Sequence, residues 1–160
     1  MLFKDENVGA VEVVIDPTNS SVIYAGLWNT RRPPWYTYRP SNGPGGGIFK
    51  STDGGDTWTQ LTQGLPADGI GRTGIAVAPT DSKRVYAVVD CLLPMPGAPT
   101  APPDPSGFGR DTTPRQGGFF RSDDGGASWT RLSADEALWG RGWYFEHVTV
   151  DPTDADVVYD

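Results

Sequence analysis

GGIFKSTDGGDTWTQLT at residues 46–62 and GGFFRSDDGGASWTRLS at residues 117–133 repeat one another closely. Each stretch has the pattern of a short strand, a tight Asp-Gly-Gly turn and a second short strand. The side chains of Asp53 and Asp124 can accept hydrogen bonds from the backbone N–H groups that follow them, as in Asx turns. The paired glycines permit the positive φ that a hairpin turn needs. The pattern therefore predicts two antiparallel hairpins of the same design.

A second hairpin pattern alternates with the first. It occurs as VEVVIDPTNSSVIYAG at 11–26, GIAVAPTDSKRVYAVV at 74–89 and HVTVDPTDADVVYD at 147–160. Each copy has alternating β-branched residues, a turn around a proline and a second strand rich in Val and Tyr, which is typical of hairpins. Taken in order, the two patterns form units of four antiparallel strands, the architecture of β-propeller blades. We therefore expect an all-β fold, an incomplete β-propeller of four-stranded antiparallel units.

The repeats also predict the limits of these units. We expect residues 1–10 to end a preceding blade, 11–62 and 73–133 to form two blades, and 147–160 to form the first half of a further blade. The turn motifs then lie at 51–58 and 122–129. Such a segment leaves unpaired strand edges, so we expect the rest of the propeller to be a partner of this chain.

The segments STDGGDTW (51–58) and SDDGGASW (122–129) resemble the Asp-box, or BNR, motif Ser/Thr-x-Asp-x-Gly-x-Thr/Ser-Trp. With the flanking hairpins, the chain resembles Asp-box propellers of the sortilin-type and xyloglucanase-type glycosyl hydrolase superfamily. The resemblance implies that the motif lies at the blade periphery, away from a ligand, and that the protein is extracytoplasmic or secreted, as bacterial members often are. The residues to which it gives this structural role are Ser51, Asp53, Gly55, Trp58, Ser122, Asp124, Gly126 and Trp129.

Functional residues are expected on the long connections 29–46, 91–117 and 134–146. In a propeller, such connections emerge on one face, and loops on a rigid scaffold commonly carry function. Aromatic rings can stack on sugars, and arginine can donate paired hydrogen bonds to hydroxyls or carboxylates. The candidate ligand-binding residues are Arg31, Arg32, Trp35, Tyr36, Tyr38, Arg72, Trp139, Arg141 and Trp143. The alternative is that the aromatic rings pack over the blade edges, and spacing does not decide between the two.

Glu146 is the candidate for a catalytic acid or base. Alignment of the repeats places it beside Val11 and Thr73, where the innermost strand of a blade begins on the loop-rich face. A glycosidase needs a second carboxylate roughly 5–10 Å away, and spacing alone singles none out. The alternative is a local ion pair of Glu146 with Arg72 or Arg141. Whether the protein is an enzyme therefore stays open, with glycoside hydrolysis as the reaction if it is one.

Composition narrows the range of partners. The 20 acidic and 13 basic residues give a net charge of −7, which disfavours nucleic acid as a partner. A single cysteine, Cys91, allows no internal disulfide and no cysteine-based metal site. The Asp-rich turns lack the ligand spacing of a calcium loop, so we expect no metal and no cofactor. No apolar run reaches transmembrane length, so no membrane span is expected.

These observations together favour a propeller fragment that presents an aromatic and arginine-rich loop face to a polysaccharide or protein ligand and is non-catalytic by itself. Part of a xyloglucanase-like glycoside hydrolase is one alternative. A sortilin-like receptor or a module like the photosystem assembly factors is another, because the same scaffold serves unrelated functions.

Overall fold

The structure is a computed structural model that describes residues 2, 5–30, 44–99, 112–140 and 146–160. Two four-stranded sheets follow one another along the chain, and each has its strands in sequence order. The first contains β1 (Val8–Asp16), β2 (Asn19–Asn29), β3 (Gly47–Ser51) and β4 (Thr59–Leu61), and the second contains β5 (Ile70–Ala78), β6 (Asp81–Cys91), β7 (Gly118–Ser122) and β8 (Thr130–Ser133). A short helix, α1 (Glu136–Trp139), precedes a two-stranded sheet of β9 (Thr149–Val150) and β10 (Val158–Tyr159). All paired strands are antiparallel, which confirms the predicted all-β fold of four-stranded units.

The first strand of each four-stranded sheet carries the same irregularity. In β1 the register shifts between Ala10 and Glu12, and in β5 it shifts between Ile70 and Thr73. Each shift places one extra residue opposite the neighbouring strand, as in a β-bulge. Both strands begin three residues before the alternating pattern predicts, because the bulge breaks the alternation at that point.

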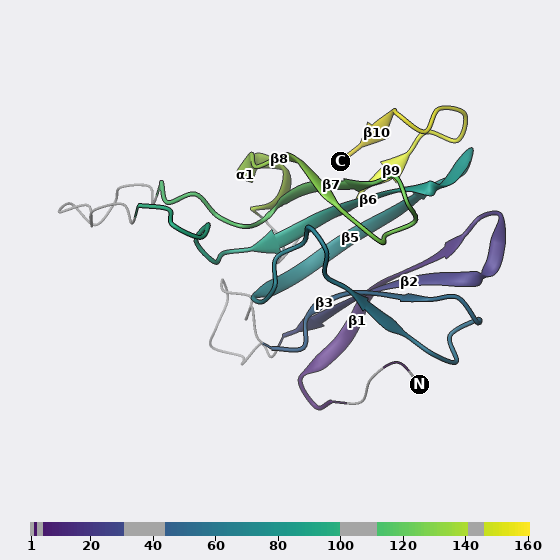
Figure 1. Ribbon diagram of the computed structural model, residues 1–160, viewed down its shortest axis with the longest axis horizontal. Helices are drawn as coiled ribbons and strands as arrows, with labels where there is room; N and C mark the ends of the chain where they lie inside the picture. Colours follow the sequence, from purple (N-terminus) through teal and green to yellow (C-terminus); the bar gives the residue numbers. More distant parts are fainter. Residues whose placement is uncertain (1, 3–4, 31–43, 100–111, 141–145) are drawn as a thin grey trace.

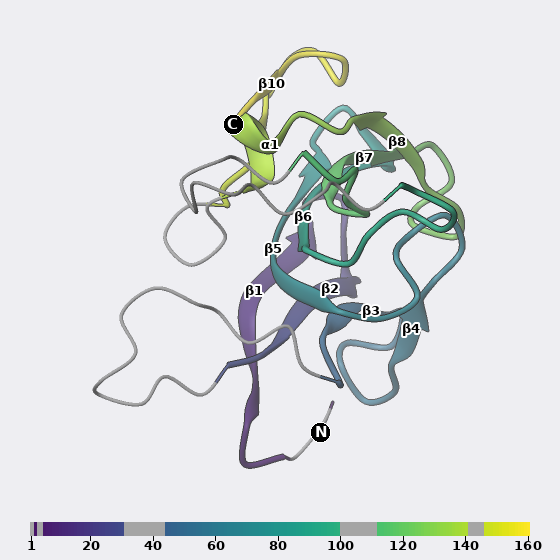
Figure 2. The ribbon, with the colours of Figure 1, turned by 90° about the vertical axis from the view of Figure 1, so that its left-hand side faces the viewer.

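The sheets are stacked face to face in chain order, with β9 and β10 beyond the second sheet (Figure 1). Strand β5 packs against β1, β2 and β3 on one side and against β9 on the other. Figure 2 shows β1 and β5 side by side, with β4 and β8 away from them at the outer side of the stack. The first strands therefore lie innermost, as in successive propeller blades.

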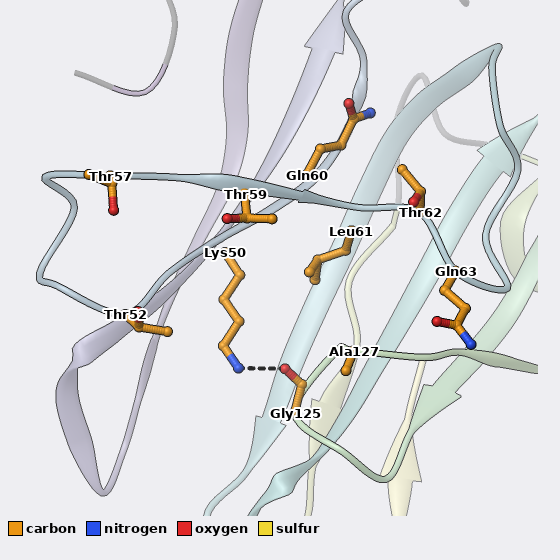
Figure 3. A pocket seen from close by; sticks show the side chains of 10 residues that line it. All are labelled: Lys50, Thr52, Thr57, Thr59, Gln60, Leu61, Thr62, Gln63, Gly125 and Ala127. Atoms are coloured by element: carbon orange, nitrogen blue, oxygen red, sulfur yellow. Dashed lines mark hydrogen bonds between the residues drawn. The ribbon is translucent and has the colours of Figure 1, made fainter.

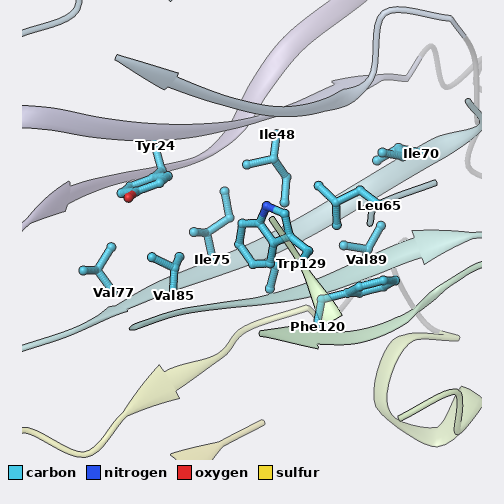
Figure 4. Packing of buried hydrophobic residues seen from close by; sticks show 11 residues of the cluster. Tyr24, Ile48, Leu65, Ile70, Ile75, Val77, Val85, Val89, Phe120 and Trp129 are labelled. Carbon is cyan, nitrogen blue, oxygen red and sulfur yellow. The ribbon is translucent and has the colours of Figure 1, made fainter. Parts of the chain in front are cut away.

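The larger core cluster fills the space between the two four-stranded sheets (Figure 4). The second sheet contributes Ile75, Val77, Val85 and Phe120, and Trp129 enters from the turn before β8. The residues that meet them from the first sheet and from the connection to β5 include Tyr24, Ile48 and Leu65. Apolar burial of this kind is the main stabilising term of such a fold.

A second seam joins the second sheet to α1 and β9. Tyr86 and Phe119 stack with ring centroids 5.7 Å apart and planes 8° from parallel. Val148 and Val150 pack against the same cluster. The Tyr86 hydroxyl donates to the carbonyl oxygen of Ala155 at 2.9 Å, which ties the second sheet to the β9–β10 hairpin.

The two Asp-Gly-Gly turns have matching hydrogen bonds. Asp53 Oδ1 accepts from the Thr57 backbone N–H at 2.9 Å, and Asp124 Oδ1 accepts from the Ser128 backbone N–H at 2.8 Å. The hydroxyls of Thr57 and Ser128 donate to the second carboxylate oxygen of the same aspartate. These donors, led by the two hydroxyls, lower the pKa of both aspartates to about 2.

The serine and tryptophan of each motif complete the turn. Ser51 Oγ accepts from the backbone N–H of Gly55 at 2.8 Å, and the indole N–H of Trp58 donates to the Gly55 carbonyl oxygen at 2.8 Å. In the second copy, Trp129 makes the same bond to Gly126 at 3.1 Å. Gly55 and Gly126 have φ values of 98° and 92°, a region that strains residues with a Cβ.

We expect Asp124→Ala to destabilise the protein at pH 7, because the turn amides lose their acceptor. The folded-state pKa is lowered, so the stabilising effect is present above the usual value of 3.8 and is lost as pH falls through about 2. Urea denaturation at several pH values should therefore show a smaller difference between wild type and variant at pH 2 than at pH 7. Asp56→Ala, at an exposed position of the first turn, is the control. Equal denaturation midpoints for Asp124→Ala and wild type at pH 7 would contradict the prediction.

Candidate functional site

The structure places three of the predicted site residues: Arg72, Trp139 and Glu146. The others lie outside the described residues, namely Arg31, Arg32, Trp35, Tyr36, Tyr38, Arg141 and Trp143. The ends of β2 and β6, at Asn29 and Cys91, and the beginning of β5 lie at the end of the stack where the long connections attach.

Trp139 lies in the core rather than on a surface. The carboxylate of Asp135 caps α1 by accepting from the Ala137 N–H at 3.0 Å, which sets the direction of the helix. The Trp139 ring is 1% exposed and covers Gly117, where an added Cβ would lie 2.5 Å from the ring. Its indole N–H donates to the Ala134 carbonyl oxygen at 3.3 Å. The ring therefore has no exposed face on which a ligand could stack.

Glu146 is brought against the middle of β5 by close backbone packing at Gly74. A Cβ added to Gly74 would lie 2.3 Å from the Glu146 carbonyl oxygen, so the glycine is what allows this approach. The Glu146 side chain is 1% exposed, and among the described residues neither carboxyl oxygen has a hydrogen-bond partner of normal geometry. Burial raises the pKa of Glu146 to about 10, and the nearby negative charges of Asp90 and Asp160 add to this effect. The Arg72 guanidinium and the Asp90 amide act in the opposite direction but less strongly, so Glu146 is protonated at neutral pH.

Asp90 is the candidate that the sequence pattern did not reveal. It is the next-to-last residue of β6 and is 3% exposed. Its place in strand alternation puts it on the same side of β6 as Tyr86 and Val88, toward the second seam. The available signal was a carboxylate inside the otherwise apolar run VYAVVDC (85–91), since buried carboxylates are rare unless they are paired or functional.

Arg72 and Asp90 both lie near enough to Glu146 to influence its pKa, and we call these three residues the inner-strand cluster. Arg72 is half-buried on β5 and is close enough to influence the Glu146 carboxyl electrostatically. No ion pair between Arg72 and Glu146 is found among the described residues, and Arg141, the other partner considered from the sequence, lies outside them. Chemically, the cluster offers a neutral carboxyl as proton donor, a second carboxyl, and a guanidinium that binds planar oxygen groups.

A groove of about 390 Å³ lies elsewhere, at the outer rim between the first sheet and the second Asp-Gly-Gly turn (Figure 3). The Lys50 ammonium donates to the Gly125 carbonyl oxygen at 2.7 Å and lies 5.3 Å from the centre of the Tyr24 ring. Hydroxyl and amide side chains line the rest, together with Leu61 and Ala127. This groove is formed by the outer strands, so it is distinct from the inner-strand cluster.

We expect Lys50→Met to lower the free energy of unfolding by about 1–2 kcal/mol, because a charge-assisted hydrogen bond across the first seam is lost. The matched control is Arg121→Met, at the same position in β7, where the guanidinium pairs with the exposed Asp123. That surface ion pair contributes about 0–1 kcal/mol. Urea denaturation of both variants checks the difference, and a larger loss for Arg121→Met would argue against the role of Lys50.

Within the described ranges, no helix has the length and apolar character needed to cross a membrane. The same ranges contain no group of three or more His, Cys, Asp or Glu side chains placed to hold a metal ion.

Comparison with known proteins gives both a sequence relative and structural neighbours. A xyloglucanase from Paenibacillus sp is 33% identical over 107 residues, which is 67% of this chain and 8% of that protein. The solved GH74 xyloglucanase from Xanthomonas campestris superposes with a TM-score of 0.57 at 16% identity, covering 97% of this chain and 20% of that one. An ancestral GH74 enzyme superposes with a TM-score of 0.54 at 17% identity, and the match covers 92% of this chain and 16% of that enzyme's chain. No protein-family profile matches the chain.

This chain spans less than a tenth of the curated relative and about a fifth or less of the solved enzymes. The structural matches share too little sequence to show more than the fold. The Asp-box and sortilin-type resemblance stays a prediction. The protein is an incomplete β-propeller with the fold of part of a GH74 enzyme, and its sequence is similar to a xyloglucanase.

Proposed function

We propose that this chain is a section of a glycoside-hydrolase-like propeller that presents its loop-bearing face to a polysaccharide of the xyloglucan type. The observation that carries the proposal is the inner-strand cluster. Arg72 and Asp90 influence the pKa of the buried Glu146, beside an apolar seam and toward the end of the stack where the long connections attach. The Glu146 carboxyl is buried and has no hydrogen-bond partner of normal geometry among the described residues, which is costly, and ionisable groups with a strongly shifted pKa gather at functional sites.

The relatives are xyloglucanases, which suggests the substrate class. The long connections of this sequence carry side chains that can bind a polysaccharide. The candidates Arg31, Trp35 and Tyr36 belong to the connection between β2 and β3, and Arg141 and Trp143 to the connection between α1 and β9. Aromatic rings and arginines are the side chains that bind sugar faces and hydroxyls. We propose that they form the platform, with Arg72 as the innermost contact.

Affinity electrophoresis in gels containing xyloglucan, with dextran gels as reference, tests the proposal. We expect retardation of wild type in xyloglucan and a loss of affinity of roughly tenfold for Arg72→Ala and for Trp35→Ala, the size of a lost charge-assisted or stacking contact. Arg121→Ala, on the outer side of the second sheet, should bind like wild type. Equal mobility of wild type in both gels would refute polysaccharide binding and favour a protein-binding module of the receptor or assembly-factor kind.

Hydrolysis of the same polysaccharide is a second candidate function, and one observation favours it. Glu146 keeps its proton at neutral pH, and an inverting or retaining glycosidase needs a protonated carboxyl as its general acid. Because Glu146 is buried, this function requires its side chain to turn toward the loop face. In the longest form of the protein that can be produced, Glu146→Gln should lower the release of reducing ends from xyloglucan by 100-fold or more while affinity in the gel is retained. Unchanged hydrolysis would remove Glu146 from the reaction.

A further inference from the structure

The groove at the outer rim, which we call the rim groove, contains a cation without an anionic partner (Figure 3). The half-buried Lys50 side chain points across the groove, and its ammonium donates to the uncharged Gly125 carbonyl oxygen at 2.7 Å. Among the described residues, no carboxylate lies within ion-pair distance of this ammonium. A lysine ammonium has three N–H donors, so Lys50 can donate further hydrogen bonds into the groove.

Two carboxylates lie in the same region, but both are engaged within their own turns. Burial raises the pKa of the Tyr24 hydroxyl to about 12, and the nearby negative charges of Asp16 and Asp124 add to this effect. The Asp16 carboxylate accepts from the backbone N–H and the hydroxyl of the residue two positions on, and the Asp124 carboxylate accepts from its own turn in the same way. Neither pairs with Lys50, so no direct contact neutralises its charge.

The second sheet shows how the repeat can neutralise a cation at this position. Arg121 stands at the position of Lys50, and its guanidinium pairs with the Asp123 carboxylate, two residues further on, at 3.1 Å. The first sheet has Thr52 where the second has Asp123. The internal carboxylate is thus replaced by an uncharged hydroxyl in the sheet that borders the rim groove.

The rest of the rim groove is polar and uncharged. The second Asp-Gly-Gly turn places Ala127 against the groove, where the first turn has Asp56 at the matching position. The volume of about 390 Å³ suits a small ligand. Hydroxyl and amide groups both donate and accept hydrogen bonds, as sugar hydroxyls do. The side chains of this kind in the groove wall include Thr52, Thr59, Thr62, Gln60 and Gln63.

We propose that the rim groove binds a uronic-acid unit of an acidic saccharide, with the Lys50 ammonium on the sugar carboxylate and the hydroxyl and amide side chains on the sugar hydroxyls. A single cation suits a single carboxylate and not a polyanion, in keeping with the net charge of −7. An acidic peptide side chain would also pair with Lys50 but would leave the surrounding hydroxyls and amides without matching partners. The groove is distinct from the inner-strand cluster, so this inference does not depend on the polysaccharide binding proposed for the loop-bearing face.

Amide chemical-shift titrations by NMR with glucuronate, glucose and acetate test the proposal. We expect glucuronate to shift the signals of residues 57–63 and 125–127, which border the groove. Glucose should bind about tenfold more weakly or worse, the size of a lost charge-assisted hydrogen bond. Acetate should bind more weakly by a similar factor, because it has no hydroxyls to pair with the groove wall.

Thr52→Asp is the decisive variant, because it supplies the carboxylate that the second sheet has at this position. The new carboxylate should pair with Lys50 and weaken glucuronate binding about tenfold or more. Thr52→Asn, which adds no charge, is the matched control and should bind like wild type. Arg121→Met, outside the groove, should also bind like wild type. Circular dichroism should show that both variants at position 52 are folded, since this side chain is exposed.

Three results would overturn the proposal: no glucuronate-induced shift at the groove, equal affinities for glucuronate and glucose, or unchanged glucuronate binding by Thr52→Asp. Acetate that binds as tightly as glucuronate would show that the groove recognises a carboxylate alone. That result would overturn the assignment to a sugar and favour an acidic peptide side chain.

Discussion

Trp129→Ala is expected to lower the free energy of unfolding by about 3–5 kcal/mol, the usual cost of removing a buried aromatic side chain. The ring is 5% exposed and lies at the centre of the first core cluster, among Ile48, Ile75 and Phe120 (Figure 4). The backbone of the same residue is also held, because its N–H donates to the Gln63 carbonyl oxygen at 3.0 Å. The variant therefore leaves a cavity that the fixed backbone cannot close.

Trp58→Ala is the matched comparison, because Trp58 has the same position in the first motif. Its indole N–H donates to the Gly55 carbonyl oxygen in the same way, but the ring is only half-buried. The ring lies on the side of the first sheet that faces away from the second sheet, and no other sheet among the described residues covers that side. We expect a loss of about 1–2 kcal/mol, in proportion to the smaller apolar area buried. Urea denaturation at pH 7 measures both. Equal losses would mean that the turn, and not the seam, determines the contribution of this tryptophan.

Glu146→Gln is expected to stabilise the protein, increasingly so as pH rises. The pKa of Glu146 is raised from 4.5 to about 10 on folding, so between these values the folded chain binds a proton that the unfolded chain has released. The contribution of Glu146 to the free energy of unfolding is therefore largest below pH 4.5. It falls as pH rises toward about 10, by at most about 1.4 kcal/mol for each pH unit. Glutamine keeps the neutral shape without this loss, so at pH 7 the gain is on the order of 3 kcal/mol.

The measurement is the difference in unfolding free energy between Glu146→Gln and wild type from pH 4 to pH 9. The ionisable groups that influence Glu146 are Arg72, Asp90 and Asp160, and all three remain in the variant. Subtracting the two curves therefore isolates the titration of residue 146. A difference that does not change with pH would mean that Glu146 is ionised in the folded protein, and the proton donor proposed for hydrolysis would be lost with it.

The fold could be predicted from the sequence because its determinants are local. The Asp-Gly-Gly turns and the alternating strands are set by residues within a few positions of one another, and the same register recurs in both sheets. The inner-strand cluster could be predicted only in part. Glu146 is located by its place in the repeat. Asp90 lies more than 50 residues before Glu146 in the sequence, and alignment of the repeats does not indicate that the two lie near each other. Trp139 resembles a loop aromatic in sequence, and only its packing over Gly117 places it in the core.

The Gly125 carbonyl oxygen accepts from both the Tyr24 hydroxyl and the Lys50 ammonium, so the turn of one sheet is held by side chains of the sheet before it. A sheet excised at its own first and last strands would therefore leave part of its stabilising contacts behind. A module for grafting or domain recombination must therefore keep Tyr24 and Lys50 together with the turn that carries Gly125. Chimeras joined between β4 and β5 should mismatch the first seam, because they separate Tyr24 and Lys50 from the turn that carries Gly125.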